Sequence, residues 1–152
     1  MKIVKIIATM ATILGITMFA APASIAAPSH DRTNPVSTGC VKGAYVLSGW
    51  GTVNTKYNQV QGRMQLMYSP TCQTNWINVY GDVSGNTYTA SINVGPAPMG
   101  GALHASVKNI GSDFSYQVYA PGSTCVTVGW SIHDNATGAV EGSDSRVFLA
   151  VI

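Results

Sequence analysis

Apolar and polar side chains alternate with a period of two along most of the chain beyond residue 43. In Thr87–Val94 the residues Tyr88, Ala90, Ile92 and Val94 share one face, and threonine, serine and asparagine occupy the other. This alternation is typical of a β-strand with one buried face. Similar patterns predict strands at Tyr45–Trp50, Gly62–Tyr68, Trp76–Val83, Leu103–Val107, Phe114–Tyr119, Cys125–Ile132 and Arg146–Ile152.

Turn-forming residues separate these segments, as in Ser84–Asn86, Asn109–Ser112 and Asp134–Gly138. No segment outside the N-terminal leader has a convincing helical period. About eight short strands with such turns predict an all-β fold, a small antiparallel sandwich or barrel.

The N-terminus has the features of a signal peptide over residues 1–26. Two lysines precede an apolar run at Ile6–Ala20, and small residues follow at Ala21–Ala27. The run is shorter than the roughly 20 residues that span a membrane, so we expect cleavage after Ala26 and a secreted, extracellular product with no membrane span. The polar stretch that follows predicts a flexible arm over 27–39 and a single all-β domain over 40–152.

Charge is scarce, at 9% of residues. Beyond residue 26, six Lys and Arg side chains balance six Asp and Glu side chains. A chain without net positive charge lacks the electrostatic attraction that nucleic-acid binding needs, so we expect no nucleic-acid partner.

Three cysteines, Cys40, Cys72 and Cys125, form an odd set for an exported protein, and three single disulfide pairings are possible. None of them has metal-ligand spacing to another, and no histidine adjoins them in the sequence. We therefore expect no metal site and no cofactor. His30 would complete a Cu(II) or Ni(II) chelate only if the chain began at Pro28, which requires a disfavoured cut after Ala27.

The run Leu66–Trp76 contains the pattern Tyr-Ser-Pro-x-Cys-x-Thr-x-Trp. It resembles the signature of a family of small secreted Gram-positive bacterial proteins of unknown function, and Tyr119–Pro121 with Cys125–Val126 resembles that family's second half. The resemblance implies export and a bacterial origin, and no activity. The family also has a fourth cysteine near its C-terminus, which this chain lacks. The resemblance therefore favours a Cys40–Cys72 disulfide and leaves Cys125 as a free thiol.

Catalytic constellations are not apparent in the sequence. The acids Asp113, Asp134, Glu141 and Asp144 lie in turn-like stretches, and neither His104 nor His133 accompanies a recognisable nucleophile motif. We expect a protein that is not an enzyme, with a small extracellular hydrolase as an alternative.

Aromatic side chains are the best candidates for ligand binding. Trp50, between Gly49 and Gly51, is expected to be an exposed platform, with Tyr57 and Tyr80 as further candidates. Trp76 and Trp130 are expected in the core. The sequence thus favours a monomeric binding module at or near the cell surface, with a cell-wall polysaccharide as its ligand.

The segment Gly95–Gly101 supports a different interpretation. Its two prolines restrict the loop, and Met99 offers an adaptable apolar anchor. On this alternative the protein is an inhibitor or partner of a secreted protein such as a protease.

Overall fold

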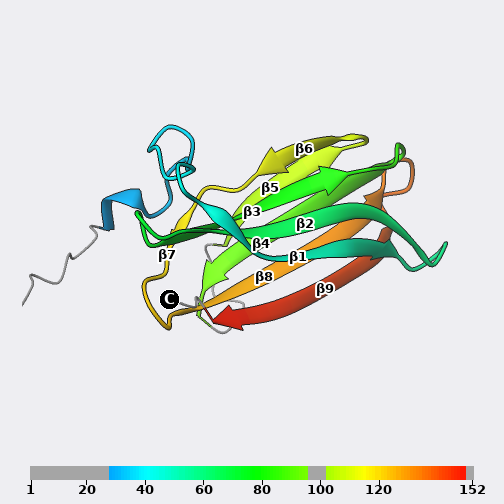
Figure 1. Cartoon of the computed structure of the whole chain (residues 1–152). Helices are drawn as coiled ribbons and strands as arrows, with labels where there is room; N and C mark the ends of the chain where they lie inside the picture. Colours follow the sequence, from blue (N-terminus) through cyan, green and yellow to red (C-terminus); the bar gives the residue numbers. More distant parts are fainter. Residues whose placement is uncertain (1–27, 96–101, 150–152) are drawn as a thin grey trace, which may run out of the picture.

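The computed structural model describes residues 28–95 and 102–149, which consist mainly of β-strands (Figure 1). The predicted signal peptide over 1–26 lies outside these residues. A short 3-10 turn, η1 (Pro28–His30), precedes the first strand. The described residues form β1 (Tyr45–Asn54), β2 (Gln59–Ser69), β3 (Thr74–Gly81), β4 (Asn86–Val94), β5 (Leu103–Lys108), β6 (Gly111–Phe114), β7 (Val118–Tyr119), β8 (Cys125–Asp134) and β9 (Val140–Leu149).

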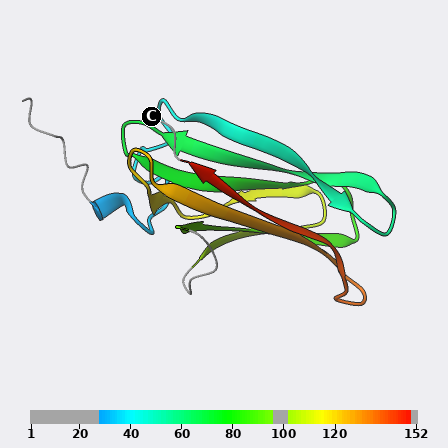
Figure 2. The same ribbon diagram turned by 90° about the horizontal axis from the view of Figure 1, so that it is seen from below.

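These strands form two antiparallel sheets that pack face to face (Figures 1 and 2). One sheet has the order β1-β2-β3-β6, and β7 also pairs with β3. The other sheet has the order β5-β4-β8-β9. The predicted all-β fold is confirmed, and its two layers make it a sandwich.

The core lies between the two sheets and follows the predicted alternation. Met64 and Ile77 face inward from the five-stranded sheet, and Tyr88, Ile92 and Val128 face inward from the four-stranded sheet. All five are completely buried. Burial of a side chain of this size contributes about 1.5–3 kcal/mol.

Two paired glycines make room for the largest of these side chains. Gly62 and Gly81 are opposite each other in the β2–β3 register. A Cβ atom on Gly81 would meet the ring of Tyr88 at 2.7 Å and would also collide with the backbone carbonyl of Asn109. The Tyr88 ring therefore occupies the space that side chains at these two positions would fill.

The segment predicted as one strand, Phe114–Tyr119, is instead divided between β6 and β7. Between them, the hydroxyl of Ser115 accepts a hydrogen bond from the backbone N–H of Ile77 (3.1 Å). This side chain replaces a backbone partner of β3, so the ladder is interrupted locally while both short strands stay on β3.

The C-terminal strand begins earlier than the alternation predicted. It starts at Val140 rather than at Arg146. The alternation missed this start because Glu141 is a buried polar residue in a position where the pattern predicts an apolar one. Residues 150–152 of the predicted strand lie outside the described residues.

The described part of the predicted flexible arm is docked against the sandwich. The buried amide of Gln117 donates to the hydroxyls of Thr33 (2.8 Å) and Thr38 (3.0 Å) and accepts from Thr74 (2.8 Å). Thr33 and Gln117 also form an isolated backbone bridge. One buried side chain thus joins residues 28–39 to the start of β3, so this segment is held in place rather than loose.

A disulfide fastens the same region. Cys40 is bonded to Cys72 in the β2–β3 connection, as the family resemblance implied, and this prediction is confirmed. Cys125, half-buried at the start of β8, is free.

A buried polar network lies where the β1–β2 hairpin meets the other sheet. Gln61 accepts from the amides of Asn54 (2.8 Å) and Asn86 (2.6 Å). Asn54 also donates to the carboxylate of Glu141, which is only 6% exposed and pairs with Lys56 at 3.2 Å. The network connects β1, β2, β4 and β9, and therefore both sheets.

The edge strands β1 and β9 belong to different sheets and lie against each other. The backbone carbonyl of Val53 approaches Gly142 so closely that a Cβ atom there would collide with it. The β1–β2 register shifts twice: Leu47 is an extra residue in β1, and Gln61 is an extra residue in β2. An extra residue of this kind interrupts the ladder and bends and twists its strand locally.

Within the residues that the structure describes, no helix has the length and apolar character needed to cross a membrane.

The Tyr88 packing predicts that Gly81→Ala destabilises the fold by about 1–3 kcal/mol, the usual cost of overpacking a core. Urea denaturation followed by far-UV circular dichroism measures this change. Gly49→Ala is the matched control, because its Cβ atom would have no neighbour closer than 3.6 Å. Equal stability of the two variants would contradict the packing described here.

Reduction of the Cys40–Cys72 bond should lower the free energy of unfolding by roughly 3–4 kcal/mol, because the bond closes a loop of 32 residues in the unfolded chain. The same urea titration with and without a phosphine reductant measures the loss. The Cys125→Ser variant should lose the same amount on reduction. An unchanged midpoint in the wild-type protein would contradict the prediction.

Candidate functional site

The outer surface of the five-stranded sheet carries a cluster of aromatic and polar side chains. Met64 and Leu66 of β2 face the core, so their neighbours Arg63 and Gln65 face outward. The cross-strand register places residues of β3 and β6 beside them. We call this cluster the binding face: Arg63, Gln65, Asn78, Tyr80, Ser112 and Phe114.

Tyr80 is at the centre of the binding face and is half-buried. The guanidinium carbon of Arg63 lies 4.9 Å from the centroid of its ring. The Tyr80 hydroxyl donates to the side-chain carbonyl of Gln65 (3.0 Å) and accepts from the amide of Asn78 (3.4 Å). These contacts hold the ring in one orientation.

Arg63 is itself held by a carboxylate. Its Nε and Nη2 atoms donate to the two oxygens of Asp82 at 3.1 Å and 3.2 Å. These hydrogen bonds raise the pKa of Arg63 further above its already high ordinary value. The pair brings no net charge to the binding face.

Two shallow hollows flank this arrangement. One, of about 250 Å³, is lined by Asn78, Tyr80, Ser112, Asp113 and Phe114. The other, of about 280 Å³, lies on the opposite side of Arg63 and Gln65 and is lined also by residues 49–51 and Met64. A ligand that spans the two hollows would cross the Arg63–Tyr80 pair.

The binding face combines an aromatic ring with polar groups, the kind of surface that can contact a sugar. Because the Arg63 guanidinium lies over one face of the Tyr80 ring, only the rest of this ring is left as apolar surface for the C–H groups of a pyranose. Amide, hydroxyl and guanidinium groups around the ring match sugar hydroxyls, the usual combination of apolar contact and a few placed polar groups.

Trp50 is not the exposed platform that the sequence predicted. Its ring points toward the core, stacks on Phe148 (5.5 Å between centroids, 19° between planes), and has the Arg146 guanidinium carbon 5.5 Å away. Side chains alternate along a strand, so Gly49 and Gly51 open the outer surface while Trp50 between them faces inward. The glycines leave room for a ligand, but on the face opposite to Trp50.

The other two tryptophans have different surroundings. Trp130 is partly buried and packs against the core. Trp76 is only 3% exposed but is opposite Met67 in the register, on the outward side of β3. Thr74, two residues earlier on that side, bonds to the Gln117 that holds residues 28–39. Trp76 is therefore buried outside the core between the sheets.

The remaining predicted binding residues do not join Tyr80. Tyr57 lies in the turn between β1 and β2, is 53% exposed, and has the Lys56 amine 5.0 Å from its ring centroid. Met99, in the predicted interaction loop, lies outside the described residues.

The acidic residues considered for catalysis make structural contacts. Asp134 accepts hydrogen bonds from the backbone of Ala136 and from Thr137, and these bonds lower its pKa. Asp144 accepts from Arg146 and from the backbone of Ser145, which also lowers its pKa. Both carboxyl groups are thus held ionised, which does not suit a general acid at neutral pH.

The histidines considered for catalysis lie on the outer surface of the four-stranded sheet. His133 is hydrogen-bonded to the hydroxyl of Ser131 (2.8 Å), two residues earlier on the same strand face. His104 lines a hollow of about 280 Å³ on this surface with Ser131 and Asp144. Asp113 belongs to the other sheet and accepts from the backbone of Ser106.

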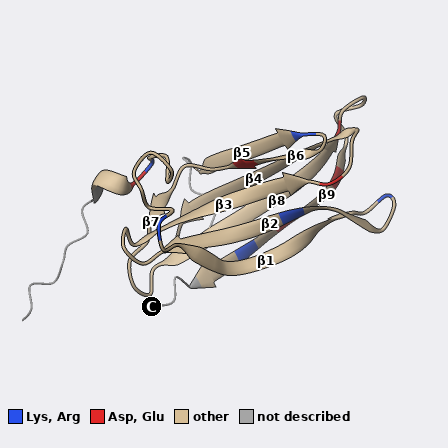
Figure 3. Ribbon diagram, turned by 45° about the horizontal axis from the view of Figure 1, so that its top comes forward, with Lys and Arg blue, Asp and Glu red and all other residues tan. Residues whose placement is uncertain are grey.

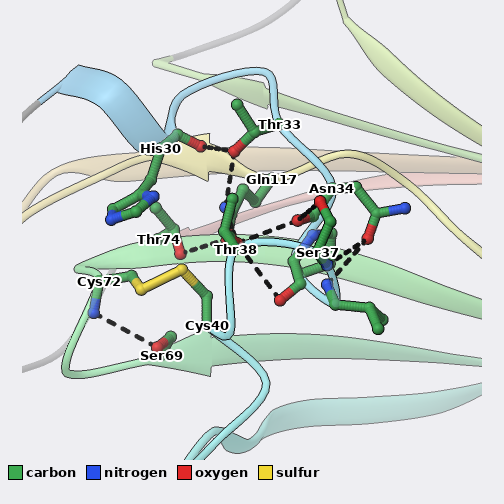
Figure 4. The surroundings of a disulfide bond; sticks show 12 residues. His30, Thr33, Asn34, Ser37, Thr38, Cys40, Ser69, Cys72, Thr74 and Gln117 are labelled. Carbon is green, nitrogen blue, oxygen red and sulfur yellow. Dashed lines mark hydrogen bonds between the residues drawn. A yellow bond between two sulfur atoms is a disulfide. The ribbon is translucent and has the colours of Figure 1, made fainter.

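His30 lies beside the disulfide, although no histidine adjoins the cysteines in the sequence (Figure 4). A ring nitrogen of His30 and the sulfur atoms of Cys40 and Cys72 lie within 4.8 Å of one another. The docking of residues 28–39 creates this cluster, which spacing in the sequence does not reveal.

Arg63, Gln65 and Asn78 were not singled out from the sequence. The period of two does indicate that they face outward, because each alternates with a core residue on its strand. Locating them on one face with Tyr80 also required the β2–β3 register.

Comparison with known protein families, curated proteins and solved structures finds no match for this chain. The family resemblance therefore stays a prediction.

The inward position of Trp50 predicts that Trp50→Ala lowers the free energy of unfolding by about 2–4 kcal/mol, somewhat less than a fully buried tryptophan. Chemical denaturation measures the loss. Tyr57→Ala, which removes an exposed ring, should change stability by less than about 0.5 kcal/mol. A Trp50→Ala protein as stable as wild type would contradict the packing of Trp50 on Phe148.

Proposed function

We propose that this protein is a secreted, monomeric and non-enzymatic binding module that holds a polysaccharide at or near the bacterial cell surface. The observation that supports this proposal is the binding face, where Tyr80 is fixed by Arg63, Gln65 and Asn78 between two shallow hollows. Fixing a ring before binding reduces the entropy that the ligand must overcome.

Charge favours a neutral polysaccharide over an anionic one. Lys, Arg, Asp and Glu residues are sparse along the described part of the chain (Figure 3). The one cation on the binding face, Arg63, is neutralised by Asp82. A polyanion would therefore meet little attraction there, whereas neutral sugars need only the ring and the hydrogen-bonding groups.

The hollows are shallow and open rather than enclosed. A surface of this kind fits a chain that lies across the sheet, with several sugar units in weak contact. We therefore expect modest affinity for single sugars and stronger retention on insoluble polymers, where several contacts act together.

Tyr80→Ala should lower retention on an insoluble polysaccharide about tenfold or more, because truncating an anchoring aromatic at a binding surface costs more than 1 kcal/mol. The measurement is a sedimentation assay on cell-wall peptidoglycan, chitin and cellulose. Tyr80→Phe, which keeps the ring, should retain most of the binding.

Tyr116→Ala is the matched control, since Tyr116 is 52% exposed in the β6–β7 connection and lies outside the binding face. It should bind as wild type does. Failure of the wild-type protein to bind any of the polymers would refute the proposal and favour a secreted protein partner. Turnover of a polymer by the pure protein would favour the hydrolase alternative.

A further inference from the structure

We propose that His30, Cys40 and Cys72 form a Zn²⁺ site when the disulfide is reduced. The three ligand atoms already lie within 4.8 Å of one another, although the sulfur atoms are now bonded together (Figure 4). Two thiolates and an imidazole are ligands that Zn²⁺ prefers, at bond lengths of about 2.0–2.3 Å. Two sulfur ligands of a tetrahedral Zn²⁺ lie roughly 3.8 Å apart, so the sulfur atoms must move out of bonding distance to admit the ion.

The imidazole is a candidate ligand because part of it is unsatisfied. The Nδ1 atom of His30 is enclosed by protein and has no hydrogen-bond partner among the described residues. A buried polar atom without a partner is costly, and such atoms are uncommon in folded proteins. A cation bound to the imidazole would give the ring a partner. In the disulfide form the Nδ1 atom has none among the described residues.

Hydrogen bonds would keep the cluster together after reduction. Gln117 binds Thr33 and Thr38 on one side and Thr74 on the other without involving either sulfur. The backbone N–H of Tyr119 also donates to Asp31, next to His30, at 2.9 Å. Breaking the S–S bond therefore leaves His30 and Cys40 held near Cys72.

The surroundings suit an enclosed site. Cys40 is fully buried and Cys72 is 7% exposed, so few waters compete for the ion. Three protein ligands leave a fourth tetrahedral position for a water molecule. Soft thiolate ligands favour Zn²⁺ over Mg²⁺ and Ca²⁺.

The chemistry balances with a dithiol as the reductant. The dithiol transfers two electrons and two protons to the Cys40–Cys72 bond, which breaks to give two thiols while the dithiol becomes a disulfide. Zn²⁺ then displaces the two thiol protons to solvent and binds two thiolates and the neutral imidazole. Exchange with a small disulfide reverses the step: that disulfide takes two electrons from the thiolates and two protons from solvent to become two thiols, the Cys40–Cys72 bond forms again, and the ion is released.

The test uses untagged protein that is reduced with a phosphine, which does not compete for the metal as a dithiol would, and desalted without oxygen. Titration with Co²⁺ should produce thiolate charge-transfer absorption at one equivalent, and Zn²⁺ should then abolish it. The oxidised protein should show neither change. Zn²⁺ should also raise the thermal midpoint of the reduced protein and leave that of the oxidised protein unchanged.

His30→Ala should weaken Zn²⁺ binding to the reduced protein about tenfold or more. This variant keeps both cysteines, and formation of its disulfide reports that the region still folds. His104→Ala, which removes an exposed histidine on the other sheet, is the matched control and should bind as wild type does. Unchanged affinity in His30→Ala would overturn the proposal. Reduced protein that stays folded but gives no Co²⁺ absorption would also overturn it. So would reduced protein that unfolds, gives no Co²⁺ absorption and does not refold when Zn²⁺ is added.

Discussion

The packing of one row of apolar side chains from each sheet against the other is the interaction on which the molecule depends. Met64 and Ile77 meet Tyr88 and Val128 across the core, and this contact decides which way every neighbouring side chain points. Because side chains in a strand alternate, burying one row exposes the next. The arrangement of Tyr80 and its polar neighbours on the outer surface is therefore a consequence of core packing.

The sequence was sufficient for the fold class because the alternation is strong in the central strands. Tyr88, Ala90 and Ile92 were assigned to the core from their spacing and are completely buried. The pattern fails where polar residues take inward or bridging positions. The start of β9 was missed because Glu141 is buried there, and a predicted strand is interrupted at Ser115. Hydrogen bonds to Asn54 and to the backbone of Ile77 satisfy these two polar side chains.

The candidate site was predicted less well because it depends on contacts between strands. Tyr80 was identified as a candidate, but its neighbours are set by register, which one strand's pattern does not specify. Trp50 was assigned from its adjacent glycines, although adjacent residues in a strand face opposite ways. His30 reaches Cys40 and Cys72 through the tertiary contacts of Gln117, so no local spacing could reveal that cluster.

The irregularity of β1 at Leu47 has a consequence for how copies of this protein behave in a crowded solution. A straight, unpaired strand at a sheet edge is a template on which another chain can add, and successive additions produce fibrils. The extra residue Leu47 interrupts the regular row of hydrogen-bonding groups of β1 that such growth requires. With Val53 also seated against Gly142, the domain can expose valines along this margin while resisting polymerisation.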